Sequence, residues 1–269
     1  MKKVILLFLV TSLTGKWAFA QDGENDLKNF RFGLKATGAI TWYKPEDKKK
    51  YESGGASARG GYGLIMEFRL NKVASIATGL QVDYDMGKIN YLSSADPNYY
   101  WLNKDGEFLE PADSASGSNP TGNTKYHLNS RTYRTTYVTL PLSLKLKTPE
   151  IGMLTYFGQF GLNSSIRLKS RVNDDVNAGT VNGAHSTQTD LLITNDMNLF
   201  RFALNIGGGA EWNLAGSTSM VFSLNWYNGF SNVMRNDSKY LFRYNNGIPE
   251  MSKQHATSNA IALTVGVLF

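Results

Sequence analysis

The sequence predicts an all-β fold: an eight-stranded antiparallel transmembrane β-barrel with long outer loops and short periplasmic turns. Three observations predict it. Apolar and polar residues alternate along eight segments, the connections between these segments are alternately long and short, and the chain starts with a stretch typical of an export signal. A chain of this length can bury its apolar residues as one domain.

The eight segments alternate with a period of two, which marks strands whose two faces meet different surroundings. In the first segment, for example, Phe32 and Leu34 fall on one face, and Arg31 and Lys35 on the other. The predicted strands are residues 30–44, 60–70, 75–91, 135–147, 154–169, 199–214, 218–230 and 259–269. Pro141 lies within the fourth segment and predicts a bulge or kink there, or alternatively a strand break, because proline lacks a backbone donor.

The connections follow a second pattern. About 15, 43, 29 and 28 residues separate the first, third, fifth and seventh strands from the next one, whereas the intervening connections, 71–74, 148–153 and 215–217, are short. This alternation is typical of outer-membrane barrels, which have tight periplasmic turns and long outer loops. An even number of strands then predicts that both termini lie in the periplasm.

The charged residues of the segments decide which face is predicted to point outward. Eight bases and four acids lie on the polar faces, and each would cost several kcal/mol in lipid, so we expect them to face the lumen. The alternative is a soluble lipocalin-like barrel with an apolar interior. The predicted lumen ion-pair network consists of Arg31, Lys35, Glu67, Arg69, Asp83, Asp85, Lys145, Arg167, Arg201 and Glu211, with Lys147 and Lys169 on the same faces. Ion-paired plugs are the favoured interpretation, and a narrow ion path or gate is the alternative.

The N-terminus predicts export and defines the domains. Lys2 and Lys3 precede an apolar stretch at 4–13, and residues 18–20 read Ala-Phe-Ala, a cleavage-site pattern. We therefore predict a signal peptide at 1–20, a short periplasmic segment at 21–29 and the barrel domain at 30–269, in a protein integral to the outer membrane. An uncleaved anchor is the alternative. The absence of cysteine excludes disulfides and a lipidated N-terminal cysteine.

Composition and motifs argue against several functions. Without Lys2, Lys3 and Lys16 the chain keeps 25 bases against 22 acids, so the net charge falls from +6 to +3 and nucleic-acid binding has no support. No metal cluster or nucleotide motif predicts a cofactor, and glycines 207–209 lie inside a strand, where small residues relieve crowding. The sequence therefore predicts a protein that is not an enzyme. The alternative, a lipid-modifying enzyme, would have to use His127, His185 or His255 of the outer loops.

Two outer loops contain aromatic hairpins that are candidates for binding. Residues 99–109 are expected to turn at Asp105-Gly106, and residues 240–248 at Asn246-Gly247. Exposed aromatic rings beside Arg and Lys would bind glycan, peptide or protein; alternatively, the hairpins only prolong the barrel above the membrane. The candidate side chains are Tyr99, Tyr100, Trp101, Phe108, Phe242 and Tyr244.

The chain resembles small outer-membrane barrels of the PorT-like and OmpA-like kind. The last strand carries Val265 and Val267 and ends on Phe269, similar to the terminal signal by which the barrel-insertion machinery recognises such proteins. Residues 137–145, Tyr-Val-Thr-Leu-Pro-Leu-Ser-Leu-Lys, and the glycine-rich residues 206–211 resemble strands of PorT-like barrels. The resemblance implies a small barrel, and it implies for a few relatives a part in protein secretion and gliding.

Together these observations predict a non-enzymatic surface anchor or accessory component, with a link to protein secretion. Its expected partners are the lipid bilayer, the insertion machinery and a surface or secretion-complex protein. The alternative is a surface receptor or adhesin that binds through its outer loops; a small channel is a further possibility.

Overall fold

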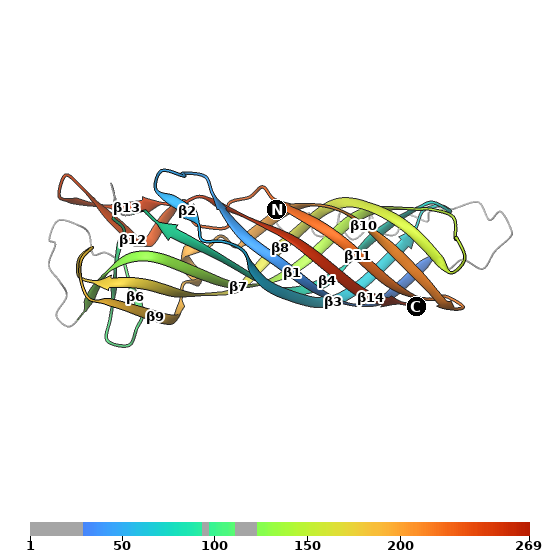
Figure 1. Cartoon of the computed structure of the whole chain (residues 1–269), viewed down its shortest axis with the longest axis horizontal. Coiled ribbons are helices and arrows are strands. Elements are labelled where there is room, and N and C mark those ends of the chain that lie inside the picture. The colour runs from blue at the N-terminus through green and yellow to red at the C-terminus, as the bar shows by residue number, and fades with distance from the viewer. Residues whose placement is uncertain (1–28, 93–96, 111–122) are drawn as a thin grey trace, which may run out of the picture.

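The computed structural model describes residues 29–92, 97–110 and 123–269 (Figure 1). The predicted signal peptide and all but the last residue of the segment at 21–29 lie outside the described residues. Within the described part, no helix is long and apolar enough to span a membrane. Strands dominate instead, accompanied by a short 3-10 helix, η3 (Thr194–Asp196).

Eight antiparallel strands close into a ring, which confirms the predicted barrel. The ring order is β1, β3, β4, β7, β8, β10, β11 and β14, and β14 pairs with β1 to close it. The bounds are β1 (Phe30–Pro45), β3 (Ser57–Arg69), β4 (Ala74–Tyr91), β7 (Thr124–Lys147), β8 (Leu154–Ala178), β10 (Phe200–Ala215), β11 (Thr218–Gly229) and β14 (Ala256–Leu268). Pro141 does not break β7, although the ladder to β4 lacks the pairings expected for Leu140 and Pro141.

The two ends of the barrel differ. Short connections close one end, called here the short-turn end, where the backbone N–H of Phe269 donates to the carbonyl of Phe32 (2.8 Å). At the other, the long-loop end, β7 begins at Thr124 instead of 135 and β8 ends at Ala178 instead of 169. These two strands stay paired from Tyr126↔Ala178 down to Lys147↔Phe157. The barrel wall therefore continues well past the predicted strand ends (Figure 1).

Six short strands gather around this prolonged wall. They are β2 (Tyr51–Ser53), β5 (Tyr99–Leu102), β6 (Phe108–Leu109), β9 (His185–Leu192), β12 (Asp237–Asn245) and β13 (Ile248–Lys253). Both predicted hairpins are confirmed: Leu102 pairs with Phe108, and Asn245 pairs with Ile248 around a turn with positive φ at Asn246 (50°) and Gly247 (81°), as a type I′ turn requires. These strands, η3, residues 124–135 of β7 and residues 170–178 of β8 are called the extension below.

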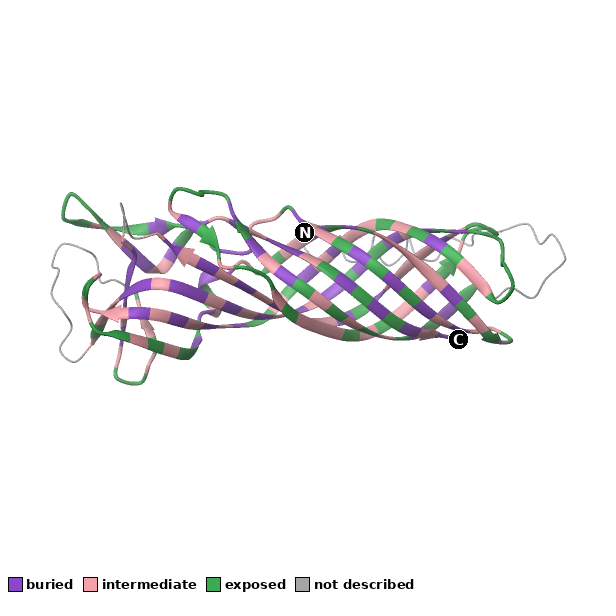
Figure 2. Ribbon diagram, in the orientation of Figure 1, coloured by how far each residue is buried: buried purple, intermediate pink, exposed green. Residues whose placement is uncertain are grey.

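Apolar side chains cover the outside of the ring. Leu34, Leu142 and Leu263 are 62%, 56% and 56% exposed, and exposed residues alternate with more buried ones along most of the barrel strands (Figure 2). Val265 and Phe269 belong to the same outward face of β14. Because isolated exposed leucines are common but a continuous band is not, this belt marks the surface that meets lipid.

Small residues make room inside the ring. A Cβ added to Gly207 would lie 2.1 Å from Oδ1 of Asn225, and one added to Gly209 would lie 1.9 Å from the carbonyl oxygen of Phe222. The glycine-rich stretch of β10 therefore admits larger side chains from neighbouring strands, as the sequence indicated.

Candidate functional site

Charged side chains cross the lumen near the short-turn end and form the lower layer. Arg31 of β1 contacts Glu67 of β3 (3.1 Å) and Glu211 of β10 (2.7 Å). Two lysines of β7 complete it: Lys145 contacts Glu67 at 3.1 Å and also pairs with Glu211, and Lys147 contacts Glu211 at 2.9 Å and also pairs with Glu67.

The lower layer is shielded from solvent and joined across the ring. Each of its five side chains is 9% exposed or less. Because the residues come from strands on different sides of the barrel, their contacts span the lumen rather than run along one wall. Three bases share two acids, so every carboxylate has several cationic partners, which is what a buried ion needs to offset its lost hydration.

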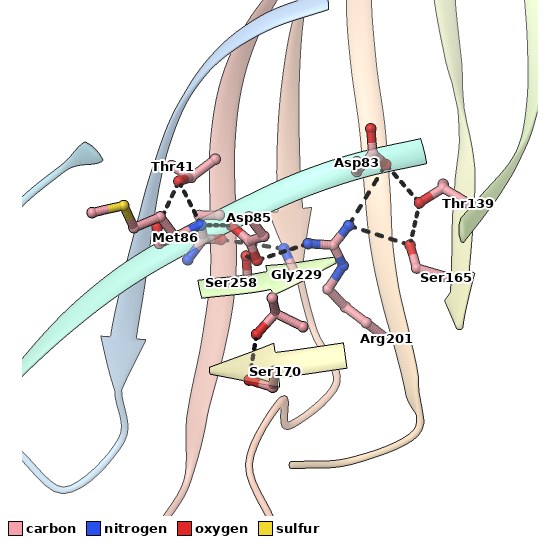
Figure 3. A network of polar contacts seen from close by, with 12 residues as sticks. Thr41, Asp83, Asp85, Met86, Thr139, Ser165, Ser170, Arg201, Gly229 and Ser258 are labelled. Carbon is pink, nitrogen blue, oxygen red and sulfur yellow. Dashed lines mark hydrogen bonds and ion pairs between the residues drawn. The ribbon is translucent and has the colours of Figure 1, made fainter. Parts of the chain in front are cut away.

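A second set of polar contacts, the upper layer, crosses the lumen nearer the long-loop end. Arg201 of β10 extends between two carboxylates of β4 and lies 2.8 Å from Asp85 and 3.9 Å from Asp83 (Figure 3). Hydroxyl donors complete the coordination: Ser258 donates to Asp85 (2.7 Å) and Thr139 to Asp83 (2.6 Å). The guanidinium also lies over the ring of Tyr137, 4.1 Å from its centroid.

The structure thus brings together seven of the ten lumen residues singled out from the sequence. The other three, Lys35, Arg69 and Arg167, form no ion pair among the described residues. Arg167 donates instead to the carbonyl of Asn198 (3.2 Å). Ser258 and Thr139 were not predicted as partners, because the sequence does not indicate which carboxylate a hydroxyl on an alternating strand will contact.

Lys169 is a correction to the predicted inward face. It is exposed on the outer wall, because β8 has a register shift: Thr136 pairs with Lys169 but Tyr137 pairs with Arg167, which leaves Leu168 as an extra residue. Such a bulge turns all following side chains to the opposite face. Alternation alone cannot reveal it.

The two layers leave little open space between them. Cavities of about 50 and 60 Å³ lie along the lumen, each with room for only a few water molecules. A larger hollow of about 700 Å³ lies at the short-turn end and is lined by Arg31, Arg69 and Lys147 among others. The lumen is therefore interrupted by side chains, in agreement with an eight-stranded barrel whose interior can just fill.

The extension packs around an apolar core. Its buried residues Tyr100, Leu128, Tyr133 and Val172 contribute to this core, together with Tyr43 near the end of β1. Hydroxyls of Tyr91 and Tyr133 hydrogen-bond at 2.8 Å, and burial raises the pKa of Tyr133 to about 12.

One ion pair lies within this core. Arg131 of β7 binds Asp174 of β8 through two contacts of 2.7 and 2.6 Å, and both side chains are fully buried. The guanidinium lies 5.3 Å from the ring centroid of Tyr100 and 5.1 Å from that of Phe108. Bidentate geometry and aromatic neighbours are the conditions under which a buried arginine is tolerated. Neither residue was singled out from the sequence.

The six aromatic binding candidates divide into core and surface. Tyr100, Tyr99 and Phe242 are 0%, 9% and 2% exposed, and Phe108 packs against the apolar core. The expectation of exposed rings is wrong for these, because β5 pairs with β7 and β12 pairs with β5, so neither hairpin stands free. Trp101 stays partly exposed and Tyr244 is 41% exposed.

Trp101 and Tyr244 lie on one face of the extension. Trp101 pairs directly with Lys125 of β7, whose Nζ lies 5.1 Å from the ring centroid of Tyr99 and 5.5 Å from that of Tyr244. Cross-strand partners share a face of a sheet. Trp101, Lys125 and Tyr244 therefore form a continuous surface, called here the aromatic face, and the rings of Tyr99 and Phe242 pack beside Tyr244.

The histidines do not assemble a catalytic group. His127 is fully buried beside Tyr99, with a ring-centroid distance of 5.4 Å. His185 contacts Asp175 at 2.7 Å, but neighbouring Ser186 points to the opposite face of β9, as adjacent strand residues do. His255 contacts Glu46 at 2.7 Å. No group of three or more metal-ligating side chains occurs among the described residues.

Among the comparisons with known proteins, a family model agrees with this architecture. A family model described as "Outer membrane protein beta-barrel domain" matches residues 19–235. A search of curated proteins finds no match. Among solved structures, Neisserial surface protein A is 10% identical and aligns over 90% of this chain and 96% of its own, with a TM-score of 0.38. OprG of Pseudomonas aeruginosa is 8% identical over 90% and 96% (TM-score 0.43), and Ail of Yersinia pestis 9% identical over 90% and 100% (TM-score 0.32).

Proposed function

Because this chain belongs to the family of outer-membrane protein β-barrel domains, we propose that it is a non-enzymatic, non-conducting barrel that anchors a rigid recognition surface outside the cell. Both termini lie in the periplasm in this proposal, so the long-loop end faces outward. The observation that carries it is the extension: β7 and β8 continue far beyond the apolar band and enclose a separate apolar core. A barrel that only had to span the membrane would not need this structure.

The closed lumen supports an anchoring role rather than transport. The two ion-paired layers interrupt the lumen, and the cavities along it hold only a few waters. In planar bilayers we expect the purified protein to give no large, steady current. Such currents would overturn the non-conducting part of the proposal without affecting the recognition part.

The aromatic face is the part of the extension best suited to bind a partner. It combines partly exposed aromatic rings with the Lys125 ammonium group, and aromatic side chains offer large contact areas at little cost in conformational entropy. Its rigidity adds to this, because the buried rings of Tyr99 and Phe242 pack against Tyr244 on the same side of the sheet. Of the six aromatic candidates, Trp101 and Tyr244 therefore contribute to binding. The proposed partner is a glycan or polypeptide at the cell surface.

Cross-linking and co-purification from outer-membrane fractions test the proposal. A variant with Trp101→Ala and Tyr244→Ala should lose the cross-linked partner while remaining folded. The control is Leu192→Ala with Ile248→Ala, which removes two exposed apolar side chains elsewhere on the extension (57% and 63% exposed). Equal recovery of the partner by both variants would overturn the assignment of the aromatic face.

The same experiment bears on the resemblance to PorT-like barrels. If the protein is an accessory component of protein secretion, stable secretion-machinery partners should co-purify with it. A partner of another kind would favour the receptor or adhesin role. The motifs at 137–145 and 206–211 support the first possibility only through resemblance.

A further inference from the structure

Basic side chains gather on the outer wall at the upper edge of the apolar band. Arg134 of β7 pairs across the ladder with Arg171 of β8, and Lys169 of β8 lies in the neighbouring row opposite Thr136. These residues face outward, because the alternate residues Thr135 and Ser170 are buried inside. The β8 bulge at Leu168 is what places Lys169 and Arg171 on this wall.

Four bases line one surface pocket. Arg59 of β3 joins Arg134, Lys169 and Arg171 around a hollow of about 180 Å³. Arg59 reaches it where β3 and β4 part: their pairing ends at Gly61↔Asp83, and the Arg59 Nε lies 3.1 Å from the sulfur of Met86.

The positive charge of the pocket is only partly compensated. Asp190 contacts Arg134 at 2.8 Å and also pairs with Arg171. Asp85 lines the pocket too, but its carboxylate is bound inside the barrel by Arg201 and Ser258. Lys169 has no hydrogen-bond or ion-pair partner, and Arg59 no acidic one, among the described residues.

The pocket lies at the depth of lipid headgroups. Exposed apolar residues adjoin it on the membrane side: Leu168 is 56% exposed, Ile166 47% and Tyr84, which lines the pocket, 44%. A lipid whose acyl chains pack on these side chains would have its headgroup beside the four bases. Arginine and lysine form strong, charge-assisted hydrogen bonds with phosphate oxygens.

We propose that this pocket, called the basic pocket, binds the phosphate group of an outer-leaflet lipid headgroup. Arg59 and Lys169 supply charge that has no acidic partner in the protein, and Arg134 and Arg171 supply planar donors. Asp190 pairs with both arginines and therefore competes with the phosphate for them. This inference does not depend on the aromatic face or on the partner that it binds.

Native mass spectrometry of the detergent-solubilised full-length protein tests the proposal. The probes are bisphosphorylated lipid A, the same lipid after removal of its phosphates, and phosphatidylcholine. We expect selective retention of bisphosphorylated lipid A, and a loss of affinity of roughly tenfold in Lys169→Gln with Arg171→Gln. The matched control, Lys44→Gln with Lys48→Gln, removes two exposed bases from the same end of the protein and should leave the affinity unchanged.

A second variant predicts a change of opposite sign. Asp190 has a positive φ (61°), which asparagine also tolerates, so Asp190→Asn should keep the backbone of β9 while removing the competing charge. We expect it to bind lipid A several-fold more tightly. The proposal is overturned if Asp190→Asn weakens binding, if both double variants lose affinity equally, or if inorganic phosphate displaces the lipid at equal concentration.

Discussion

The barrel lumen and the extension are built from the same strands but have opposite interiors. On β7, Lys145 and Lys147 point into a lumen of charged groups and Leu142 faces outward, whereas Tyr133 and Leu128, further along the strand, face an apolar core. The surrounding solvent accounts for the reversal. Next to lipid, leucine side chains are stable and charged side chains are not. Next to water, charged side chains are stable and apolar ones are buried in the core.

The reversal also explains how each region treats its ions. Among the described residues, the lumen contains two layers of interlinked ion pairs, and the extension core contains the single pair Arg131–Asp174. In the lumen, polar and charged side chains fill the interior of the barrel. In the extension, Arg131 and Asp174 have to satisfy each other within an apolar core, so the loss of this ion pair should disturb only that core.

Removing both acids of the lower layer should damage the barrel most. In Glu67→Gln with Glu211→Gln, Arg31, Lys145 and Lys147 would remain buried together without a counter-charge. Breaking a buried ion pair costs about 3–5 kcal/mol, and here two carboxylates are lost. We expect failure to insert, or a large loss of stability in urea unfolding from lipid vesicles. Lys147→Gln leaves two bases for two acids and serves as the control; an equal loss there would contradict the charge-balance argument.

Breaking the pair in the extension should have a large but local effect. Arg131→Met leaves Asp174 buried without its partner, at a cost of about 3–5 kcal/mol. Limited proteolysis should then cut the extension while the ring stays protected. Arg131→Met with Asp174→Leu should restore most of the resistance, because two apolar side chains suit this core. Cleavage throughout the ring in the single variant would show that the two regions are not independent.

A charge placed on the outer wall should be costly in one region and harmless in the other. Leu142→Arg puts a cation into the apolar band and should cost about 2–4 kcal/mol in bilayers. Thr132→Arg places the same side chain on the same outward face of β7, but beyond the band, and should change stability by less than about 0.5 kcal/mol. Unfolding in vesicles of defined lipid measures both. Similar costs would mean that the band extends over the extension.

The smallest effect concerns pH. Burial lowers the pKa of His127 from its ordinary 6.5, so below that pH the unfolded extension binds a proton that the folded one does not. The stabilising contribution is therefore present above pH 6.5 and declines as the pH falls. Hydrogen exchange of β5 at pH 8 and pH 5 should show this decline, and His127→Phe should remove it. His185 and His255 remain in both proteins, so a decline that persists in the variant would assign it to them.

The strands could be predicted from the sequence, because the wall of a membrane barrel has lipid on one side and polar groups on the other. This arrangement imposes a period of two on the residues of each strand, and the two different ends of the barrel impose an alternation of loop lengths. The two hairpins could be predicted as well, because Asn-Gly and Asp-Gly favour tight turns whatever surrounds them. The sequence also indicates the inward face of each strand, because the alternate apolar residues occupy the face toward lipid. The residues predicted in this way to point inward include Arg31, Glu67, Lys145 and Glu211.

The outward bases, the buried aromatic rings and the ion pair of the extension depend on the tertiary structure. The extra residue at Leu168 moved Lys169 and Arg171 to the outer wall, and a bulge leaves no mark on composition. The burial of Tyr99, Tyr100 and Phe242 depended on where the hairpins dock, and the Arg131–Asp174 pair depended on the register of two strands beyond the membrane. Beyond the apolar band, water surrounds the chain, so the pattern of polar and apolar residues no longer shows where a strand ends and a loop begins. Packing between segments that are distant in the sequence determines the strand ends there.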